Sequence, residues 1–339
     1  MSTSERRLTA AIWSNFNHNN DLCRYQVCAQ GEVIYHSGLF RISLSINRYK
    51  ALSRKVLISV FIFSQLVIGT VANAQPVVSA SIKPLQLIAA AITTGIGGNN
   101  EPGLIIGPAQ DPHHPSLRPS ERRTLYAADI LLWVGPQLEA ALADVIDPTS
   151  STVINAYELT QESGLSVSGT IDPHVWLSTQ NARLIAETLT QKLVLLDVEN
   201  RQPYENNLDD FLSSLDMLDV EINAALEALQ QTPFAVYHNA FRYYEKQYGL
   251  THTASYTDNE ELQPGIRKVL EVRESLAANN VSCLLLEPSN NPEEISQLTG
   301  RDMTLMTIDI LGFDYVANKT GYRDFMLGIT QSVKECLQP

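Results

Sequence analysis

The chain has 339 residues, of which 44% are hydrophobic and 18% are charged, and its net charge is −13. This composition is that of a folded globular protein long enough for two domains. Residues 1–74 contain 8 of the 24 basic and 3 of the 37 acidic residues, so residues 75–339 contain 16 basic and 34 acidic ones and carry a net charge of −18. So acidic a surface repels nucleic acid and anionic lipid, and we expect neither as a partner.

Residues 48–74 have the three parts of a secretory signal peptide. Four basic residues precede an apolar stretch over 56–71, and a small-residue cleavage site ends at Ala74. A single transmembrane anchor is the alternative, but the apolar run is short for a span and contains polar residues. We therefore expect export, cleavage near Ala74 and no membrane anchor in the mature protein. Residues 1–47 precede the signal, and we interpret them as an extension outside the mature protein.

The first part of the exported chain alternates short apolar strands with helices. The expected strands are 77–82, 104–106 and 130–134, and the expected helices are 85–93, 120–128 and 181–196. Strands that alternate with helices in this way are typical of a parallel sheet covered by helices.

A long helix is expected next, over 203–231. Apolar residues recur at three- and four-residue steps from Phe211 to Leu229, and the run contains neither glycine nor proline after Pro203. A helix of this length would span about 40 Å. We assign 201–232 to a rigid segment that links two lobes.

The strand and helix alternation then resumes. The expected strands are 234–237, 281–286 and 303–308, and the expected helices are 240–248, 264–278, 292–298 and 322–337. We therefore predict an α/β fold with two lobes, 75–200 and 233–339. Each lobe is a small, mostly parallel sheet flanked by helices, and one long backbone helix joins the two.

The two cysteines of the exported part are Cys283 and Cys336, whereas Cys23 and Cys28 lie in the N-terminal extension. An even number of cysteines in an exported protein favours a disulfide between Cys283 and Cys336. Two buried free thiols are the alternative.

Three histidines in separate short motifs are the strongest functional signal. His113 and His238 each follow an apolar strand, His174 lies in the loop before the last helices of the first lobe, and Asp309 follows the last strand. Ligands in parallel α/β sheets bind at the carboxyl ends of the strands, so these residues can meet at one edge. Three imidazoles and one carboxylate would complete a tetrahedral zinc site.

Three of these residues also have a simpler interpretation. His113 could be solvated in its proline-rich loop, and His174 could be a core histidine bonded to a backbone carbonyl. Asp309 could cap the turn that follows it. The sequence alone does not show that the four residues converge.

The exported part resembles the zinc-binding periplasmic component of metal-uptake ABC transporters. Motifs in the expected order carry the resemblance over roughly 260 residues, which makes it far more specific than any single motif. They are Ala80-Ser81-Ile82-Lys83-Pro84-Leu85, Pro112-His113, Trp133-Val134-Gly135-Pro136-Gln137-Leu138-Glu139, Asp172-Pro173-His174-Val175-Trp176-Leu177, His238-Asn239-Ala240-Phe241, Glu287-Pro288 and Asp309-Ile310-Leu311-Gly312.

The resemblance implies two lobes with four-stranded sheets and a Zn²⁺ ion held between them for delivery to a membrane permease. It places the family's three ligand histidines on His113, His174 and His238 and the fourth position on Asp309, or on water. An imidazole at His238, where manganese-binding relatives have a carboxylate, favours zinc. The family's disulfide would match the two exported cysteines. We expect the mature protein to be a periplasmic monomer.

The sequence departs from the family pattern in two places. The segment 147–171 is rich in Ser and Thr and contains no histidine, whereas many zinc-binding members have a long loop there rich in His and acidic residues. His114 replaces the acidic residue that usually follows the first ligand, and it could be a ligand, a neighbour of the ligands or neither.

Two other functions remain open at this point. A manganese- or iron-binding relative, or an adhesin, would use the same fold. A zinc hydrolase would also use three histidines, with Glu287 or Glu139 as general base. The sequence contains no His-Glu-x-x-His motif, and a carboxylate at Asp309 would close the coordination site. We therefore favour a metal-binding protein without enzymatic activity.

Overall fold

The computed structural model describes two separate units, Met1–Ala72 and Asn73–Pro339. The residues described are 24–28, 32–37, 40–45, 75–97, 101–108, 110–146, 151–167, 169, 171–258 and 263–338. The first unit contains one antiparallel sheet in the order β1-β2-β3, with strands β1 (Arg24–Cys28), β2 (Glu32–Ser37) and β3 (Phe40–Ser45). We expected no such sheet from the sequence. The signal peptide predicted over 48–74 lies outside the described residues.

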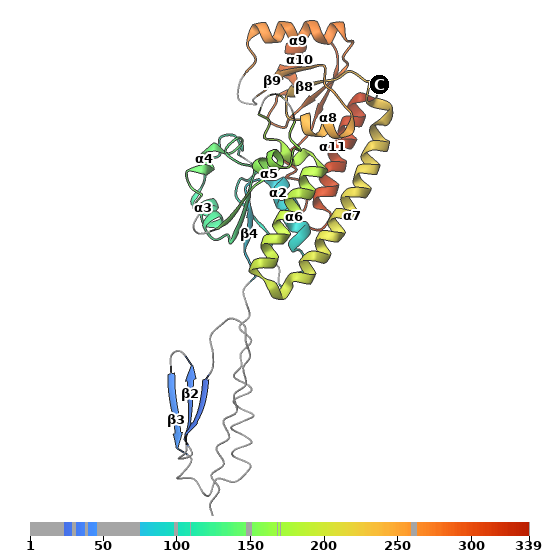
Figure 1. The fold of residues 1–339 in the computed structure, drawn as a ribbon. Coiled ribbons are helices and arrows are strands. Elements are labelled where there is room, and N and C mark those ends of the chain that lie inside the picture. Colours follow the sequence, from blue (N-terminus) through green and yellow to red (C-terminus); the bar gives the residue numbers. More distant parts are fainter. Residues whose placement is uncertain are drawn as a thin grey trace, which may run out of the picture. The chain divides into compact units, whose positions relative to one another are not determined.

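The second unit contains two four-stranded parallel sheets, one in each lobe (Figure 1). The first has the order β5-β4-β6-β7 and the second β9-β8-β10-β11. Both orders are the same when the strands are counted along the chain: second, first, third, fourth. The strands are β4 (Val78–Ala80), β5 (Gly103–Leu104), β6 (Ile130–Trp133), β7 (Thr152–Asn155), β8 (Ala235–His238), β9 (Ala254–Thr257), β10 (Cys283–Leu286) and β11 (Thr304–Thr307). The predicted two-lobed α/β fold is confirmed.

Helices cover these sheets. Those of the first lobe are α2 (Lys83–Thr93), α3 (Pro119–Tyr126), α4 (Ala140–Ala143), α5 (Ala156–Glu162), the 3₁₀ turn η2 (Val175–Leu177) and α6 (Thr179–Leu196). Those of the second lobe are α8 (Arg242–Tyr248), α9 (Ile266–Ala278), α10 (Pro292–Thr299) and α11 (Gly321–Leu337). In Figure 1, α9 and α10 lie on one side of the second sheet and α11 lies on the other.

Side-chain alternation along the strands explains why both faces of the second sheet are covered. Val236 and Leu285 face the larger apolar core, whereas Tyr237 and Leu284 face a smaller cluster shared with α9 and α10. Successive side chains of a strand point to opposite faces of the sheet. A strand that is apolar at every position is therefore buried on both faces. His238 comes two residues after Val236 and therefore points to the face of the larger core.

The long helix α7 (Arg201–Leu226) has 26 residues and lies along both lobes. It follows the 3₁₀ turn η3 (Val198–Asn200), and the 3₁₀ turn η4 (Glu227–Leu229) continues it. Its buried side chains repeat at helical spacing: Tyr204, Asn207, Phe211, Leu215, Leu218, Ile222 and Leu226. Figure 1 shows α7 and α11 side by side, and α7 also packs against α2 and α6. The expected helix is therefore present, with its last five predicted residues in or beyond the 3₁₀ turn.

Cys283 at the start of β10 and Cys336 near the end of α11 form a disulfide with 5.5 Å between their Cα atoms. The predicted pairing is confirmed, and the bond attaches the last helix to the second sheet. Among the described residues, every helix is too short or too polar to cross a membrane.

Candidate metal centre

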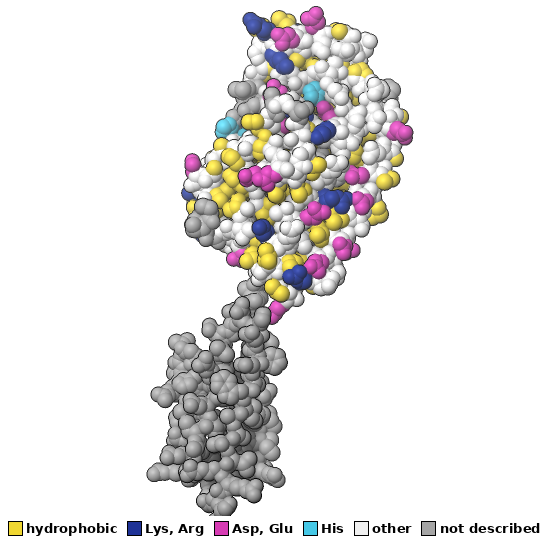
Figure 2. Space-filling model, viewed as in Figure 1, with side chains coloured by type: hydrophobic (Ala, Val, Ile, Leu, Met, Phe, Trp, Pro, Cys, Tyr) yellow, Lys and Arg dark blue, Asp and Glu magenta, His cyan; other side chains and the backbone are white. Residues whose placement is uncertain are grey.

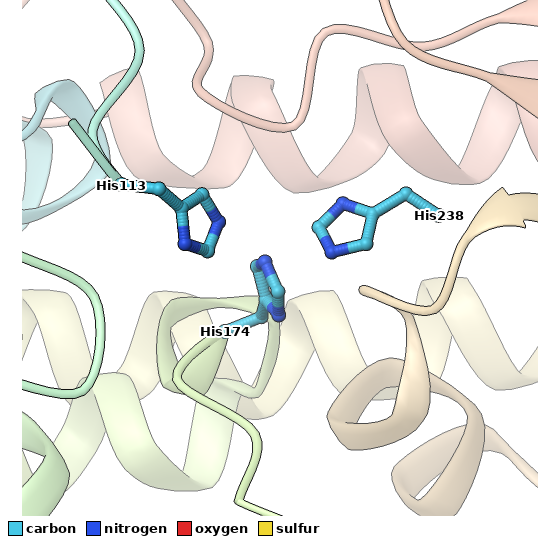
Figure 3. Close-up of side chains that lie close together, drawn as sticks. All are labelled: His113, His174 and His238. Carbon is cyan, nitrogen blue, oxygen red and sulfur yellow. The ribbon is translucent and has the colours of Figure 1, made fainter. Parts of the chain in front are cut away.

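Three histidines from distant parts of the chain converge in the second unit (Figure 3). One ring nitrogen of each of His113, His174 and His238 lies within 4.8 Å of those of the other two. The ring centroids of His174 and His238 are 4.8 Å apart, and His113 lies 5.9 Å from the first and 6.0 Å from the second. Figure 3 shows the three rings pointing toward a common point. The structure therefore brings together the three histidines, which the sequence alone could not establish.

His238 is positioned by strand register and by a carboxylate. It is the last residue of β8, and its Nδ1 is 2.7 Å from Oε1 of Glu287, which directly follows β10. Val236 of β8 pairs with Leu285 of β10, so two residues further along, His238 lies opposite Glu287. The β8–β10 junction is the topological switch point of this sheet order, where α/β proteins bind ligands.

His174 is positioned by its own Asp-Pro-His tripeptide. Oδ1 of Asp172 accepts a hydrogen bond from the backbone N–H of His174 at 3.0 Å and lies 2.8 Å from its Nδ1. The same turn recurs at the first histidine, where Oδ1 of Asp111 accepts the backbone N–H of His113 at 2.8 Å. Aspartate commonly bonds the backbone two residues ahead, which fixes the direction of the chain at each histidine.

Carboxylates lie against Nδ1 in two of the three rings. With Nδ1 of His174 and His238 facing Asp172 and Glu287, Nε2 is the ring nitrogen that would coordinate a cation. A histidine that binds a metal through one ring nitrogen usually has a carboxylate hydrogen-bonded to the other. The carboxylate fixes the tautomer of the ring and raises the basicity of the nitrogen that binds the metal. Zinc bonds of 2.0–2.1 Å place tetrahedral nitrogens about 3.4 Å apart, so a small approach of the rings would suffice.

Burial differs among the three histidines. His174 and His238 are 3% and 2% exposed, whereas His113 is half-buried in the loop between β5 and α3. His113 is thus the most accessible of the three side chains.

Asp309 is not among the residues that the structure gathers at this centre. Its Oδ1 accepts the backbone N–H of Leu311 at 2.9 Å and its Oδ2 that of Phe313 at 2.8 Å. The aspartate thus stabilises the turn after β11, the alternative that the sequence left open. Its role as fourth ligand stays a prediction. His114 is exposed next to His113.

Sequence reasoning did not assign Asp172 or Glu287 as partners of the histidines. The signal for Asp172 was present, since an aspartate two residues before a histidine can reach both its backbone and its ring. The role of Glu287 depends on which strands are neighbours. Because β8 and β10 are adjacent although β9 lies between them in the chain, spacing alone does not reveal it.

The fold and this centre define a class: a two-lobed binding protein with a helical backbone and a cluster of imidazoles between its lobes. The family model of the periplasmic zinc-uptake complex component A matches residues 78–336. The chain belongs to this family.

Curated relatives agree with this family, and solved structures share its fold. The high-affinity zinc uptake system protein ZnuA of Haemophilus ducreyi is 29% identical over 82% of this chain and 98% of its own length. That of Yersinia pestis is 26% identical over 78% of this chain and 92% of its own. A crystal structure of ZnuA has a TM-score of 0.67 at 20% identity, and the periplasmic zinc-binding protein TroA of Treponema pallidum has 0.66 at 19%. Each structure covers 78% of this chain and matches over its whole length.

Proposed function

We propose that this protein captures Zn²⁺ in the periplasm with His113, His174 and His238 and delivers it to the permease of an ABC transporter. The convergence of three imidazoles within 4.8 Å carries the proposal. Membership of a periplasmic zinc-uptake family supports the location and the partner. A signal peptide removed near Ala74 would leave a mature monomer without a membrane anchor.

The donor set supports zinc over manganese. Imidazole nitrogen suits zinc, whereas manganese prefers carboxylate and water oxygens. Two of the three imidazoles, those of His174 and His238, are buried, and a carboxylate lies against Nδ1 of each. Neutral imidazole is required for coordination, so zinc binding should weaken as the solution is acidified.

Surface charge plays a smaller part in capture. Figure 2 shows acidic side chains interspersed with basic and apolar ones over the face that it presents. At physiological salt, such charges act over only about 8 Å. Recognition of the ion therefore depends on the imidazoles.

We propose Asp309 as the fourth ligand, with water as the alternative. Its carboxylate would have to exchange at least one of its backbone hydrogen bonds for the metal. Asp309→Asn keeps one oxygen acceptor, and so one of the two hydrogen bonds to the turn, and removes the charge. A loss of zinc affinity in this variant supports ligation by the carboxylate, and unchanged affinity assigns the position to water.

Single substitutions test the proposal. His113→Ala, His174→Ala and His238→Ala should each lower zinc affinity by at least about a hundredfold, since each removes one of the nitrogen ligands. Isothermal titration of metal-free protein against zinc, in competition with a chelator, measures the change. His252→Ala is the control, because His252 pairs with Glu245 away from the cluster.

Two results would reject the proposal. One is a wild-type protein that binds less than one zinc ion per chain, or a variant without one of the three histidines that binds zinc as tightly as the wild type. The other is competition in which manganese displaces zinc at equal concentration.

A further inference from the structure

We propose that Trp176 is a positioning residue for metal binding: its indole fixes the ring of His174 and ties it to the loop that carries Asp309. The inference rests on the proposed function, because it concerns the same zinc site. Trp176 would not contact the metal itself. Its hydrogen bond would instead set the position of His174, which does.

The indole of Trp176 has contacts on both sides of the site. Its ring packs edge-on against the ring of His174, with 5.2 Å between the centroids. Its Nε1–H donates a 2.8 Å hydrogen bond to the backbone oxygen of Ile310, a residue 134 positions further along the chain. Trp176 is 1% exposed, so neither contact competes with bulk water. One rigid side chain therefore joins a predicted ligand of the first lobe to the loop that follows β11.

The acceptor of this bond lies next to the predicted fourth position. Ile310 directly follows Asp309, whose carboxylate holds the turn through the backbone N–H groups of Leu311 and Phe313. A shift of the Ile310 carbonyl would thus move Asp309 as well. The indole sets the spacing between His174 and the Asp309 loop.

The backbone around Trp176 is fixed from the second lobe too. The hydroxyl of Tyr322 on α11 donates to the backbone oxygens of Trp176 at 2.8 Å and Ser178 at 3.3 Å. The Ser178 hydroxyl donates to Oε1 of Gln247 on α8 at 2.7 Å. The 3₁₀ turn η2, which begins directly after His174, is therefore attached to α8 and α11 as well as to its own helix α6.

The test is Trp176→Phe, which keeps an aromatic ring against His174 but removes the N–H donor together with part of the buried ring system. Trp133→Phe is the matched control. Trp133 is 7% exposed at the end of β6, and its indole N–H has no hydrogen-bond partner among the described residues, so phenylalanine removes no bond there. Zinc affinity is measured by chelator competition, and the visible absorption of the Co²⁺-loaded protein reports the ligand geometry.

We expect Trp176→Phe to weaken zinc binding about tenfold, the lower end of the effect of outer-shell changes at metal sites. We also expect it to change the Co²⁺ spectrum. Trp133→Phe should leave both as in the wild type. If Trp176→Phe does not fold, Tyr322→Phe takes its place in the test. This substitution releases the backbone of Trp176 and so lets the indole shift. We again expect weaker zinc binding and a changed Co²⁺ spectrum.

The proposal is overturned if Trp176→Phe, or Tyr322→Phe in its place, binds zinc with wild-type affinity. It is equally overturned if affinity falls while the Co²⁺ spectrum stays that of the wild type, since that result assigns the residue to stability alone. Failure of the wild type itself to bind zinc would instead reject the proposed function.

Discussion

Replacing Glu287 with glutamine tests whether the carboxylates behind the histidines contribute to zinc binding. Oε1 of Glu287 lies 2.7 Å from Nδ1 of His238, and the two side chains are 8% and 1% exposed. Glutamine keeps an oxygen at this position and removes the negative charge. The ring would therefore stay in place but become a weaker donor to the metal.

The expected loss follows from the burial of this pair. Outer-shell partners of metal-bound histidines are typically worth 10- to 100-fold in metal affinity. This range corresponds to about 1.4–2.7 kcal/mol of binding free energy. Because both groups are nearly inaccessible to water, we expect Glu287→Gln to lie in the upper half of the range. Isothermal titration with zinc in the presence of a competing chelator measures it.

The chain provides a matched control in a second pair of histidine and glutamate. Oε1 of Glu245 lies 2.7 Å from Nδ1 of His252, and Glu245 is also 8% exposed. The His252 ring packs against Phe234, just before β8, whereas His238 ends that strand, and these two positions are about 13 Å apart along the strand. Glu245→Gln should leave zinc affinity unchanged. Wild-type affinity in Glu287→Gln, or an equal loss in both variants, would refute this reasoning.

Two further predictions concern stability. Replacing Cys283 and Cys336 with serine should lower the free energy of unfolding by about 4 kcal/mol in the chain-entropy model, because the disulfide closes a loop across 53 positions. Denaturant unfolding measures this loss, and an unchanged unfolding midpoint would contradict the prediction. Burial raises the pKa of Glu139 from 4.5 to about 7, against hydrogen bonds from the backbone N–H groups of Val134 and Gly135. The folded state then holds a proton that the unfolded state releases, so stability falls as the pH rises from about 4.5 to about 7. Glu139→Gln should remove this pH dependence, which amounts to on the order of 3 kcal/mol of unfolding free energy. Curves of unfolding free energy against pH that run parallel for the variant and the wild type would refute the prediction.

The regular elements of the fold were predictable where a strong periodicity or a proline marked them. The buried stripe of α7 gave the longest helix, and Pro292 marked the start of α10. Strands β7 and β9 were missed because their sequences, Thr-Val-Ile-Asn and Ala-Ser-Tyr-Thr, are short and mixed in polarity. Each lies at the end of its sheet, where only one neighbouring strand has to be matched.

The three histidines were predictable as candidates, but their environment was not. Local sequence identified His113, His174 and His238, because each stands beside a strand end or in a tight Asp-Pro-His turn. The partners of His238 and of Trp176 depend on strand order and on the packing of the loop after β11, which one sequence does not fix. Asp309 shows the same limit, since a carboxylate at a strand end can cap a turn as readily as it can bind a cation.

The coordination of bound zinc tests the central claim most directly. X-ray absorption at the zinc edge, on protein loaded with one equivalent of Zn²⁺, measures the number and type of atoms around the ion. We expect three imidazole nitrogens at about 2.0–2.1 Å and one oxygen. Fewer than three imidazoles around the ion, or a shell made mainly of oxygen, would show that His113, His174 and His238 do not bind it together.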